Sequence, residues 1–524
     1  MNISQDVEKS NLKSIQTEII RPIQINQDTA TFVFRNIGHL DKHTKITLAA
    51  VSKNLTDGAN NAYSYPLSCG IASLIRSAKL IANGVEIASN DNVAHWVAMS
   101  SHFEPVQFRD QVSKCRLGIY NTFQPSRVGT NSSGANANKQ GKLTLKSLNW
   151  PVQAGNAETV AQQGLHPNYQ LTGDPETTMR GYISLEQLFP KMYNATQLPL
   201  MFIKDEVSLV LQFNKNGQAP RNNHRMVGSN AELAQADLVS CDILLDEVEM
   251  LVDYLHYFDN SAISSKVMGE GYTLTYGDLD YNNFSMIGLP VANVAGIRNT
   301  KKYTFNLGLT GLTIRQMYLI YAPDVQTEQN AGDAWKRQHP IQGNFCSIEP
   351  TRLDNGLSLQ VKINGQNLYV NPVQNSAEHL ERLCATYGSR YESPMSVFCQ
   401  WDNYGDDLDA KALVDGGGNI NLGASFHDKC LLSSQSQVNG HPIIQLSGSA
   451  FYNGIDLQKP VLTADGTLAK VDLPGSGTKI VNTPVFIEIT RDIPENNSDD
   501  NRNLIVISCI EKNLVIKNGL IQVI

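Results

Sequence analysis

Residues 74–87 read LIRSAKLIANGVEI, and residues 357–369 read LSLQVKINGQNLY. Each stretch is an apolar strand pattern that runs into an Asn-Gly pair and continues as a second, short strand. Asn and Gly tolerate the positive φ angles that a two-residue hairpin turn requires. The sequence therefore predicts two β-hairpins, with their turns at Asn83-Gly84 and at Asn364-Gly365.

The two hairpins belong to a longer repeat. A helix pattern follows each of them, at about 91–102 and at 375–388, where an N-cap residue precedes an apolar face. Because Asn-Gly turns are common in β proteins, a single match would be weak evidence of a repeat. Four elements in one order, with Asn83 and Asn364 281 positions apart in a chain of 524, predict two domains of the same fold.

Short runs of alternating apolar and polar residues dominate the rest of the chain. This alternation is typical of antiparallel sheets with one buried face. A last hairpin is predicted around Asn518-Gly519, and Ser184 to Pro190 predicts one capped helical turn. The clearest strand patterns lie at 46–50, 207–213, 303–309, 317–321 and 357–363.

This inventory predicts an all-β chain of two tandem eight-stranded jelly rolls with short helices and long surface loops. We expect an N-terminal arm at 1–25, a first roll at 26–256, a linker at 257–270 and a second roll at 271–524. Immunoglobulin-like sandwiches fit less well, because they are shorter and lack a helix after each hairpin. The Gly-, Asn- and Ser-rich stretches predicted to be surface loops are 125–142, 215–232, 403–424 and 463–480.

Charge and composition exclude several classes of function. The chain has 42 Lys and Arg against 50 Asp and Glu, a net charge of -8, and no cationic tail. Direct binding of nucleic acid needs a basic face, so we do not expect it. No apolar run is long enough to span a bilayer, and the N-terminus lacks a signal-peptide pattern. The eight dispersed cysteines are interpreted as reduced, mostly buried thiols.

The sequence contains no recognisable catalytic or metal-binding motif. The eleven histidines form no His-x-His pair, and His39 and His43 are interpreted as solvated residues of a turn. His95 and His379 occupy like places in the repeat, where packing or a helix-surface role is expected. Nucleophile-elbow and phosphate-loop motifs are lacking, and Asp406-Asp407 and Asp499-Asp500 lie in polar stretches. We predict no catalytic, cofactor or metal site, and no enzyme.

Three segments resemble the double jelly-roll major capsid proteins of the lineage that includes adenovirus hexon, the virophages, the polinton-like viruses and the large nucleocytoplasmic DNA viruses. They are Arg180 to Pro190 with the strand at 206–213, the stretch 246–254, and the strands at 303–307 and 317–321 followed by the Asn364-Gly365 hairpin and its helix. The length is closer to the virophage and polinton-like proteins than to hexon.

The resemblance implies a homotrimeric, pseudo-hexameric capsomer in the icosahedral shell of a double-stranded DNA virus. Two similar domains in each chain let threefold symmetry imitate sixfold symmetry. Further implied partners are neighbouring capsomers, penton proteins and minor capsid or cement proteins, and an internal membrane is compatible with it. The location would be the virion, after synthesis in the host cytoplasm or nucleus.

Two alternatives remain open at the level of the sequence. A tandem jelly-roll attachment or glycan-binding protein would need surface aromatics in a concave site. The four tryptophans, at 96, 150, 335 and 401, are dispersed along the chain. A polysaccharide-active enzyme has only the fold class in its favour.

Overall fold

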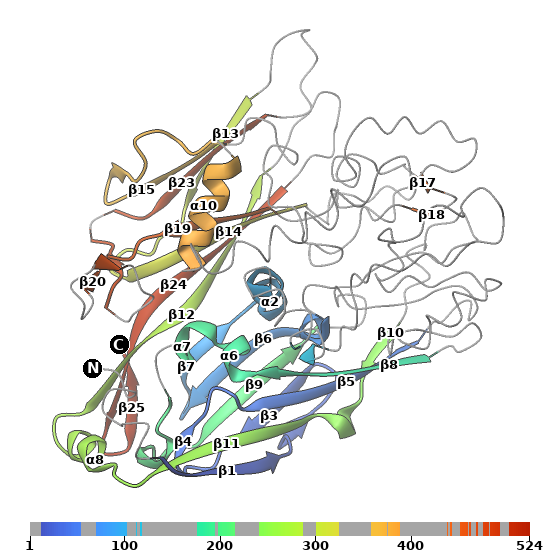
Figure 1. Ribbon diagram of the computed structural model, residues 1–524, viewed down its shortest axis with the longest axis vertical. Coiled ribbons are helices and arrows are strands. Elements are labelled where there is room, and N and C mark those ends of the chain that lie inside the picture. The colour runs from blue at the N-terminus through green and yellow to red at the C-terminus, as the bar shows by residue number, and fades with distance from the viewer. Residues whose placement is uncertain are drawn as a thin grey trace.

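The computed structural model of the chain shows strands and short helices in both halves of the sequence (Figure 1). The described residues are 12–53, 70–101, 112, 116–117, 176–193, 197–214, 240–286, 300–323, 358–374, 376–387, 437–438, 441–442, 451–459, 461–462, 468–469, 475–481, 483–492 and 502–524.

The described strands between residues 12 and 257 form two antiparallel sheets packed as a sandwich. The first sheet has the order β1-β11-β5-β8, with β4 paired to β11 and β10 paired to β5. Its strands are β1 (Leu12–Ile20), β4 (His39–Leu40), β5 (Lys45–Lys53), β8 (Glu176–Ser184), β10 (Ser240–Ile243) and β11 (Glu249–Tyr257). The second sheet, in spatial order, consists of β2 (Gln24–Ile25), β3 (Thr29–Val33), β9 (Val207–Phe213), β6 (Ile75–Ala82) and β7 (Val85–Asn90).

The strands after residue 271 form a second pair of antiparallel sheets. One contains, in spatial order, β12 (Tyr272–Met286), β24 (Arg502–Lys517), β14 (Thr313–Pro323) and β19 (Phe451–Asp456), with β22 (Thr478–Lys479) beside β14 and β25 (Leu520–Val523) beside β24. The other contains β13 (Thr300–Asn306), β23 (Phe486–Asp492), β15 (Ser358–Ile363) and β16 (Gln366–Asn367). Two separate pairs are β17 (Gln437–Val438) with β18 (His441–Pro442), and β20 (Val461–Leu462) with β21 (Leu468–Ala469).

Both sandwiches have the same strand order. If the eight principal strands of each half are counted along the chain, the first, eighth, third and sixth form one sheet in that spatial order. The second, seventh, fourth and fifth form the other sheet. The strands β1, β3, β5, β6, β7, β8, β9 and β11 thus correspond, in turn, to β12, β13, β14, β15, β16, β19, β23 and β24.

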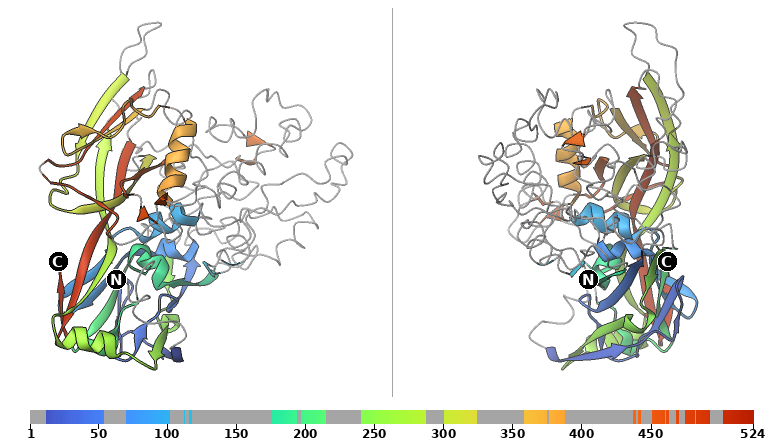
Figure 2. Two further views of the ribbon diagram at one scale, coloured as in Figure 1. Left: turned by 60° about the vertical axis from the view of Figure 1, so that its left-hand side comes forward. Right: turned by 90° about the vertical axis from the view of Figure 1, so that its right-hand side faces the viewer.

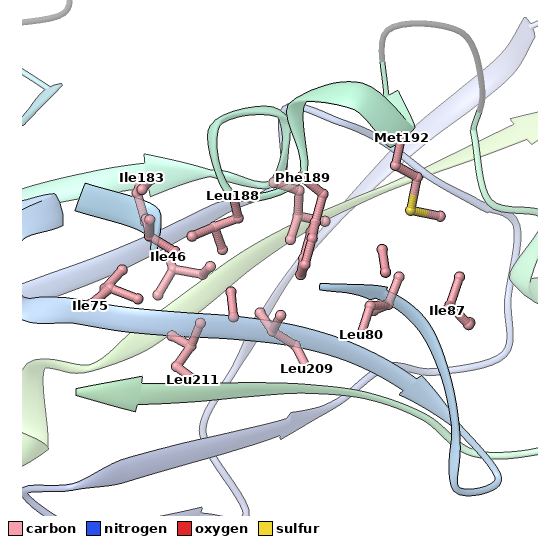
Figure 3. Close-up of a cluster of buried hydrophobic side chains, with 14 of the residues drawn as sticks. Ile46, Ile75, Leu80, Ile87, Ile183, Leu188, Phe189, Met192, Leu209 and Leu211 are labelled. Atoms are coloured by element: carbon pink, nitrogen blue, oxygen red, sulfur yellow. The ribbon is translucent and has the colours of Figure 1, made fainter. Parts of the chain in front are cut away.

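Alternation along the strands builds the core of each sandwich. In β9 the odd-numbered residues from Val207 to Phe213 are buried, whereas the intervening residues are partly or fully exposed. Their side chains meet those of the facing sheet, as Figure 3 shows for Leu209 and Leu211 with Ile46 and Ile183. A separate cluster, which includes Leu319, Val361 and Ile487, fills the second sandwich. The predicted strand patterns at 46–50, 207–213 and 317–321 are confirmed as parts of β5, β9 and β14. The patterns at 303–309 and 357–363 overlap β13 and β15, but β13 already ends at Asn306 and β15 begins at Ser358.

Helices are short and follow the repeat. α2 (Val93–Ser101) comes after β7, and α10 (Ser376–Tyr387) comes after the corresponding β16, so both predicted helices are confirmed. Figure 2 shows α2 and α10 on the same side of the β12–β24 pair. The remaining helical elements are α6 (Leu185–Leu188), α7 (Pro190–Tyr193), α8 (Ser261–Met268) and the 3-10 turns at Gly70–Leu74, Leu200–Phe202 and Leu245–Glu247. No helix in the described ranges is long and apolar enough to cross a membrane.

Local chemistry explains where these elements start and turn. The hydroxyl of Ser184 accepts a hydrogen bond from the main-chain N–H of Gln187, whose side chain bonds back to Ser184, so α6 begins with the predicted capping box. The predicted range 1–25 contains β1, which pairs along its length with β11, and the predicted range 257–270 contains α8. The predicted loops 125–142, 215–232 and 403–424, and most of 463–480, lie outside the described residues.

Candidate functional site at the junction of the two sandwiches

The strands β12 and β24 belong to both halves of the molecule. They are 15 and 16 residues long, and one end of the pair covers the core of the second sandwich through Met286 and Leu504. At the other end, Tyr272 and Leu274 of β12 are 1% and 2% exposed and join the core cluster of the first sandwich. Figure 1 shows this two-stranded ribbon passing from one sandwich to the other. The contact region is called the junction below.

At the junction, side chains of β12 complete the hydrogen bonding of β7. In the described sheet β7 is an edge strand, so its outward main-chain groups have no neighbouring strand. The hydroxyl of Tyr276 donates to the carbonyl oxygen of Ile87, and the N–H of Ser89 donates to Oδ1 of Asp278 at 2.9 Å. Residues two apart in a strand present their main-chain groups to the same edge. Two alternate residues of β12 therefore satisfy two alternate residues of β7.

Asp278 is a buried carboxylate, 3% exposed, and a lysine of the second sandwich balances its charge. Its Oδ2 lies 2.5 Å from Nζ of Lys512 on β24. Burial raises the pKa of Asp278, and the adjacent Lys512 cation opposes that increase. Burial likewise raises the pKa of Tyr276, which therefore keeps its proton and acts as a donor. Asp278 thus links Ser89 of the first sandwich to Lys512 of the second, beside the bond from Tyr276 to Ile87.

A second polar chain crosses the junction beside α7. Nζ of Lys191 donates to Oε1 of Gln316 on β14 at 2.5 Å, and Nε2 of Gln316 donates to the carbonyl oxygen of Thr386 on α10 at 2.6 Å. Lys191 and Gln316 are 6% and 2% exposed. Rings of Trp96 and Tyr318 meet edge to face next to them, with centroids 5.3 Å apart. Each polar group of the chain is bonded to another protein group, which a buried polar network requires.

Gly277 allows the two halves to approach this closely. A Cβ atom at this position would lie 1.9 Å from a guanidinium nitrogen of Arg315 and 2.9 Å from Cβ of Lys191. Arg315 is 1% exposed, and its guanidinium donates to Sγ of Cys509 at 3.5 Å. A Gly inside a strand marks a close approach of another chain segment. This Gly lies in the middle of β12, between the two residues that bond to β7.

The three predicted Asn-Gly turns are not brought together. Asn83 and Gly84 connect β6 to β7 with φ of 48° and 76°, and Asn364 and Gly365 connect the corresponding β15 and β16 with φ of 50° and 79°. They therefore occupy the same step of the strand order in the two sandwiches.

The third turn alone lies at the junction. Asn518 and Gly519 connect β24 to β25 with φ of 54° and 87°. The N–H of Asn518 donates to the carbonyl oxygen of Val267 at 3.0 Å, and the N–H of Lys204 donates to the carbonyl oxygen of Gly519 at 2.9 Å. The C-terminal hairpin is thus attached to both α8 and the first sandwich.

The interpretation of His39 as a solvated turn residue was wrong. His39 belongs to β4, is fully buried, and lies with Nε2 3.1 Å from Oδ1 of Asn260. Burial lowers its pKa from 6.5 to about 4, so the ring is neutral. His43 has an exposed side chain, and His95 is buried in α2. Within the described ranges, no three His, Cys, Asp or Glu side chains are grouped so as to hold a metal ion.

Comparison with known proteins gives likeness only at the level of structure. No family model and no curated protein matches the sequence. A chain in the cryo-EM structure of the Sputnik virophage is 12% identical, with a TM-score of 0.51 over 99% of this chain and 89% of that one. The chain has the double jelly-roll fold. The shared strand order of its two sandwiches is the feature of this molecule that agrees with that assignment.

Two major capsid proteins are also similar to this double jelly roll. The faustovirus protein is 10% identical, with a TM-score of 0.48 over 96% of this chain and 90% of that one. The mavirus protein is also 10% identical, with a TM-score of 0.46 over 100% of this chain and 93% of that one. Within the double jelly roll, the junction is the place where the two rolls are fixed to each other.

Proposed function

We propose that this chain is the major capsid protein of an icosahedral double-stranded DNA virus, and that three copies form a pseudo-hexameric capsomer. The first jelly roll would consist of the predicted range 26–256 together with β1 from the predicted arm. The second would span 271–524, and the linker 257–270 would join them. The observation that carries the proposal is one strand order built twice in a single chain. Three such chains present six similar rolls, which suits a position with six neighbours.

The junction supports this function because a shell unit must keep its two rolls in one orientation. A flexible linker would leave the angle between the rolls variable, and relative motion is the usual expectation for domains with a small interface. Here the ribbon of β12 and β24 contributes to both cores, and Asp278 and Gln316 bond across the junction in buried surroundings. The pair of rolls is thereby one rigid building block.

In each sandwich, several strands that adjoin long connections have those ends side by side. Such an arrangement suits a molecule that carries its long connections at one end. In the first sandwich Lys53 pairs with both Glu176 and Ser240, and each of these three residues adjoins a long connection. In the second, Arg502 pairs with both Met286 and Pro323. We propose that these ends of the rolls face outward. Because the strand order is shared, we also propose that Asn83-Gly84 and Asn364-Gly365 are equivalent turns of the repeat.

The same proposal assigns the chain a structural and non-catalytic role in the virion. Its partners would be further copies of itself, neighbouring capsomers, and penton and minor capsid proteins. The net charge of -8 argues against a surface that binds the genome directly.

Light scattering after size-exclusion chromatography tests the proposal. We expect a mass of about three times the 57.7 kDa of the chain, or larger assemblies, and hexagonal particles by electron microscopy. A protein that stays monomeric at all concentrations and binds glycans would overturn the capsid role and support the attachment alternative.

A further inference from the structure

The contact between the two rolls within a chain provides a template for the contact between chains. Within a chain the edge strand β7 of the first sandwich meets the edge strand β12 of the second. In the shared strand order, β7 corresponds to β16 and β12 corresponds to β1. If first and second rolls alternate around a pseudo-sixfold ring, the ring contains two types of contact. One is the β7–β12 contact within a chain, and the other would join β16 of one copy to β1 of the next.

The strand β1 has the exposure expected of a surface that another molecule covers. It pairs with β11 along its length, yet residues 12–17 are exposed on both faces of the strand. Ile15 and Ile19 are 56% and 61% exposed, whereas Tyr272 and Leu274 of the corresponding β12 are 1% and 2% exposed. Among the described strands, β1 has a neighbour on only one side. An apolar edge of this length is prone to aggregation unless something covers it.

The edge formed by β16 and the segment after it is the matching surface. The segment continues along β15, since the N–H of Leu368 donates to the carbonyl oxygen of Val361 at 2.7 Å and Leu359 and Val373 exchange two hydrogen bonds. Its outer side presents Leu368, 37% exposed, and Val370, 97% exposed. A Val exposed to this degree gains free energy from burial, about 25 cal/mol for each Å² removed from water.

Charges on the two surfaces are compatible with an apolar contact. Residues 364–374, NGQNLYVNPVQ, contain no charged side chain. Around β1, Glu18 pairs with Arg35 at 3.1 Å and Arg21 pairs with Glu249 at 3.2 Å, both within the first sandwich. Lys13 can keep its ammonium group in water while its stem lies along an apolar surface. Docking would thus leave no carboxylate of these pairs without its partner.

We propose that β1 of one copy docks on the edge of β16 and residues 366–373 of a second copy, and so repeats between chains the β12–β7 contact found within each chain. This inference rests on the proposed function, and it names the surface that closes the ring. Two different patches on one chain make a head-to-tail contact, which is the type that generates closed rings.

Charge substitution at both edges tests the docking. The double variant Ile15→Asp/Ile19→Asp and the single variant Val370→Asp place a carboxylate in the proposed contact. The matched control is Leu520→Asp on β25, where a side chain 60% exposed belongs to neither edge. The mass is measured by light scattering, and the fold is checked by circular dichroism and the thermal midpoint. Three further variants, Ile19→Asp, Val370→Lys and the two combined, test for complementation.

We expect the wild type and Leu520→Asp to be trimeric. The edge variants should fold, with the circular dichroism spectrum of the wild type, but should form less trimer. Their trimer dissociation constant should be at least about tenfold higher than that of the wild type. Ile19→Asp combined with Val370→Lys should regain trimer relative to either single variant. Trimeric edge variants would overturn the docking and leave the capsid role intact. A monomeric wild type would overturn both the docking and the proposed function.

Discussion

The hydroxyl of Tyr276 donates a hydrogen bond to the carbonyl oxygen of Ile87, so a side chain of the second sandwich completes the edge of the first. Asp278, two residues on, does the same for the N–H of Ser89. Because side chains rather than another strand satisfy this edge, the two sheets meet without merging into one continuous sheet. The halves can therefore be similar sandwiches and still form a single rigid unit.

Removing the phenol hydroxyl should weaken the junction measurably. In Tyr276→Phe the carbonyl of Ile87 stays buried and loses its partner, which costs about 1–3 kcal/mol of unfolding free energy. Tyr257→Phe is the control, because its hydroxyl bonds at 2.7 Å to Gln197 in a partly exposed place within one sandwich. Urea unfolding of the two variants gives the comparison. If both variants lost the same unfolding free energy, the bond at the junction would contribute no more than the partly exposed bond of Tyr257.

Gly277 should tolerate no side chain. Gly277→Ala would bring a Cβ atom against Arg315, Cys509 and Lys191, and overpacking of this kind costs about 3 kcal/mol or more. Gly365→Ala is the comparison, because nothing lies within 4 Å of its added Cβ and only the positive φ opposes the change. We expect a lower thermal midpoint for Gly277→Ala than for Gly365→Ala. The reverse order would contradict the close packing of the junction.

Buried His39 should make the protein sensitive to acid. Its pKa is 6.5 when unfolded and about 4 when folded, so the unfolded chain binds more protons between these values. The unfolding free energy is therefore fully present above pH 6.5 and decreases as the pH falls toward 4, by about 3 kcal/mol in total. Urea unfolding at pH 7 and pH 4.5 should show this loss in the wild type.

The matched variants separate His39 from the carboxylates that also titrate in acid. His39→Gln should show a smaller loss between pH 7 and pH 4.5, whereas the exposed His43→Gln should behave like the wild type. If all three proteins lost the same free energy, His39 would not be the source of the acid sensitivity.

The fold was predictable from the sequence because its signals are local. Period-two alternation indicated segments of β5, β9, β13, β14 and β15, and Ser184 with Gln187 forms the capping box that the spacing predicted. The repeat of hairpin and helix indicated two similar domains before any pairing was known. In these cases a few residues that are close in the sequence determine the local structure.

The junction was not predictable, because its partners are far apart in the sequence. Tyr276 and Ile87 are separated by 189 positions, and nothing near either residue indicates the other. His39 looked like a turn residue in the stretch GHLDKH, but it pairs with Leu255 of β11, more than two hundred residues later. Two local signals were present, the Asn518-Gly519 turn and Gly277, a Gly inside a strand. Such a Gly marks a close approach without naming what approaches.

The C-terminal hairpin should be necessary for folding. Ile516 on β24 is fully buried in the cluster of the first sandwich, so Ile516→Ala should cost about 2–5 kcal/mol of unfolding free energy. Leu520→Ala, four residues on and 60% exposed, should change it by less than about 0.5 kcal/mol. Deletion of residues 513–524 removes Leu514 and Ile516 together and should abolish soluble, folded protein. A truncated chain that folds with the wild-type thermal midpoint would contradict the view that β12 and β24 stabilise both sandwiches at once.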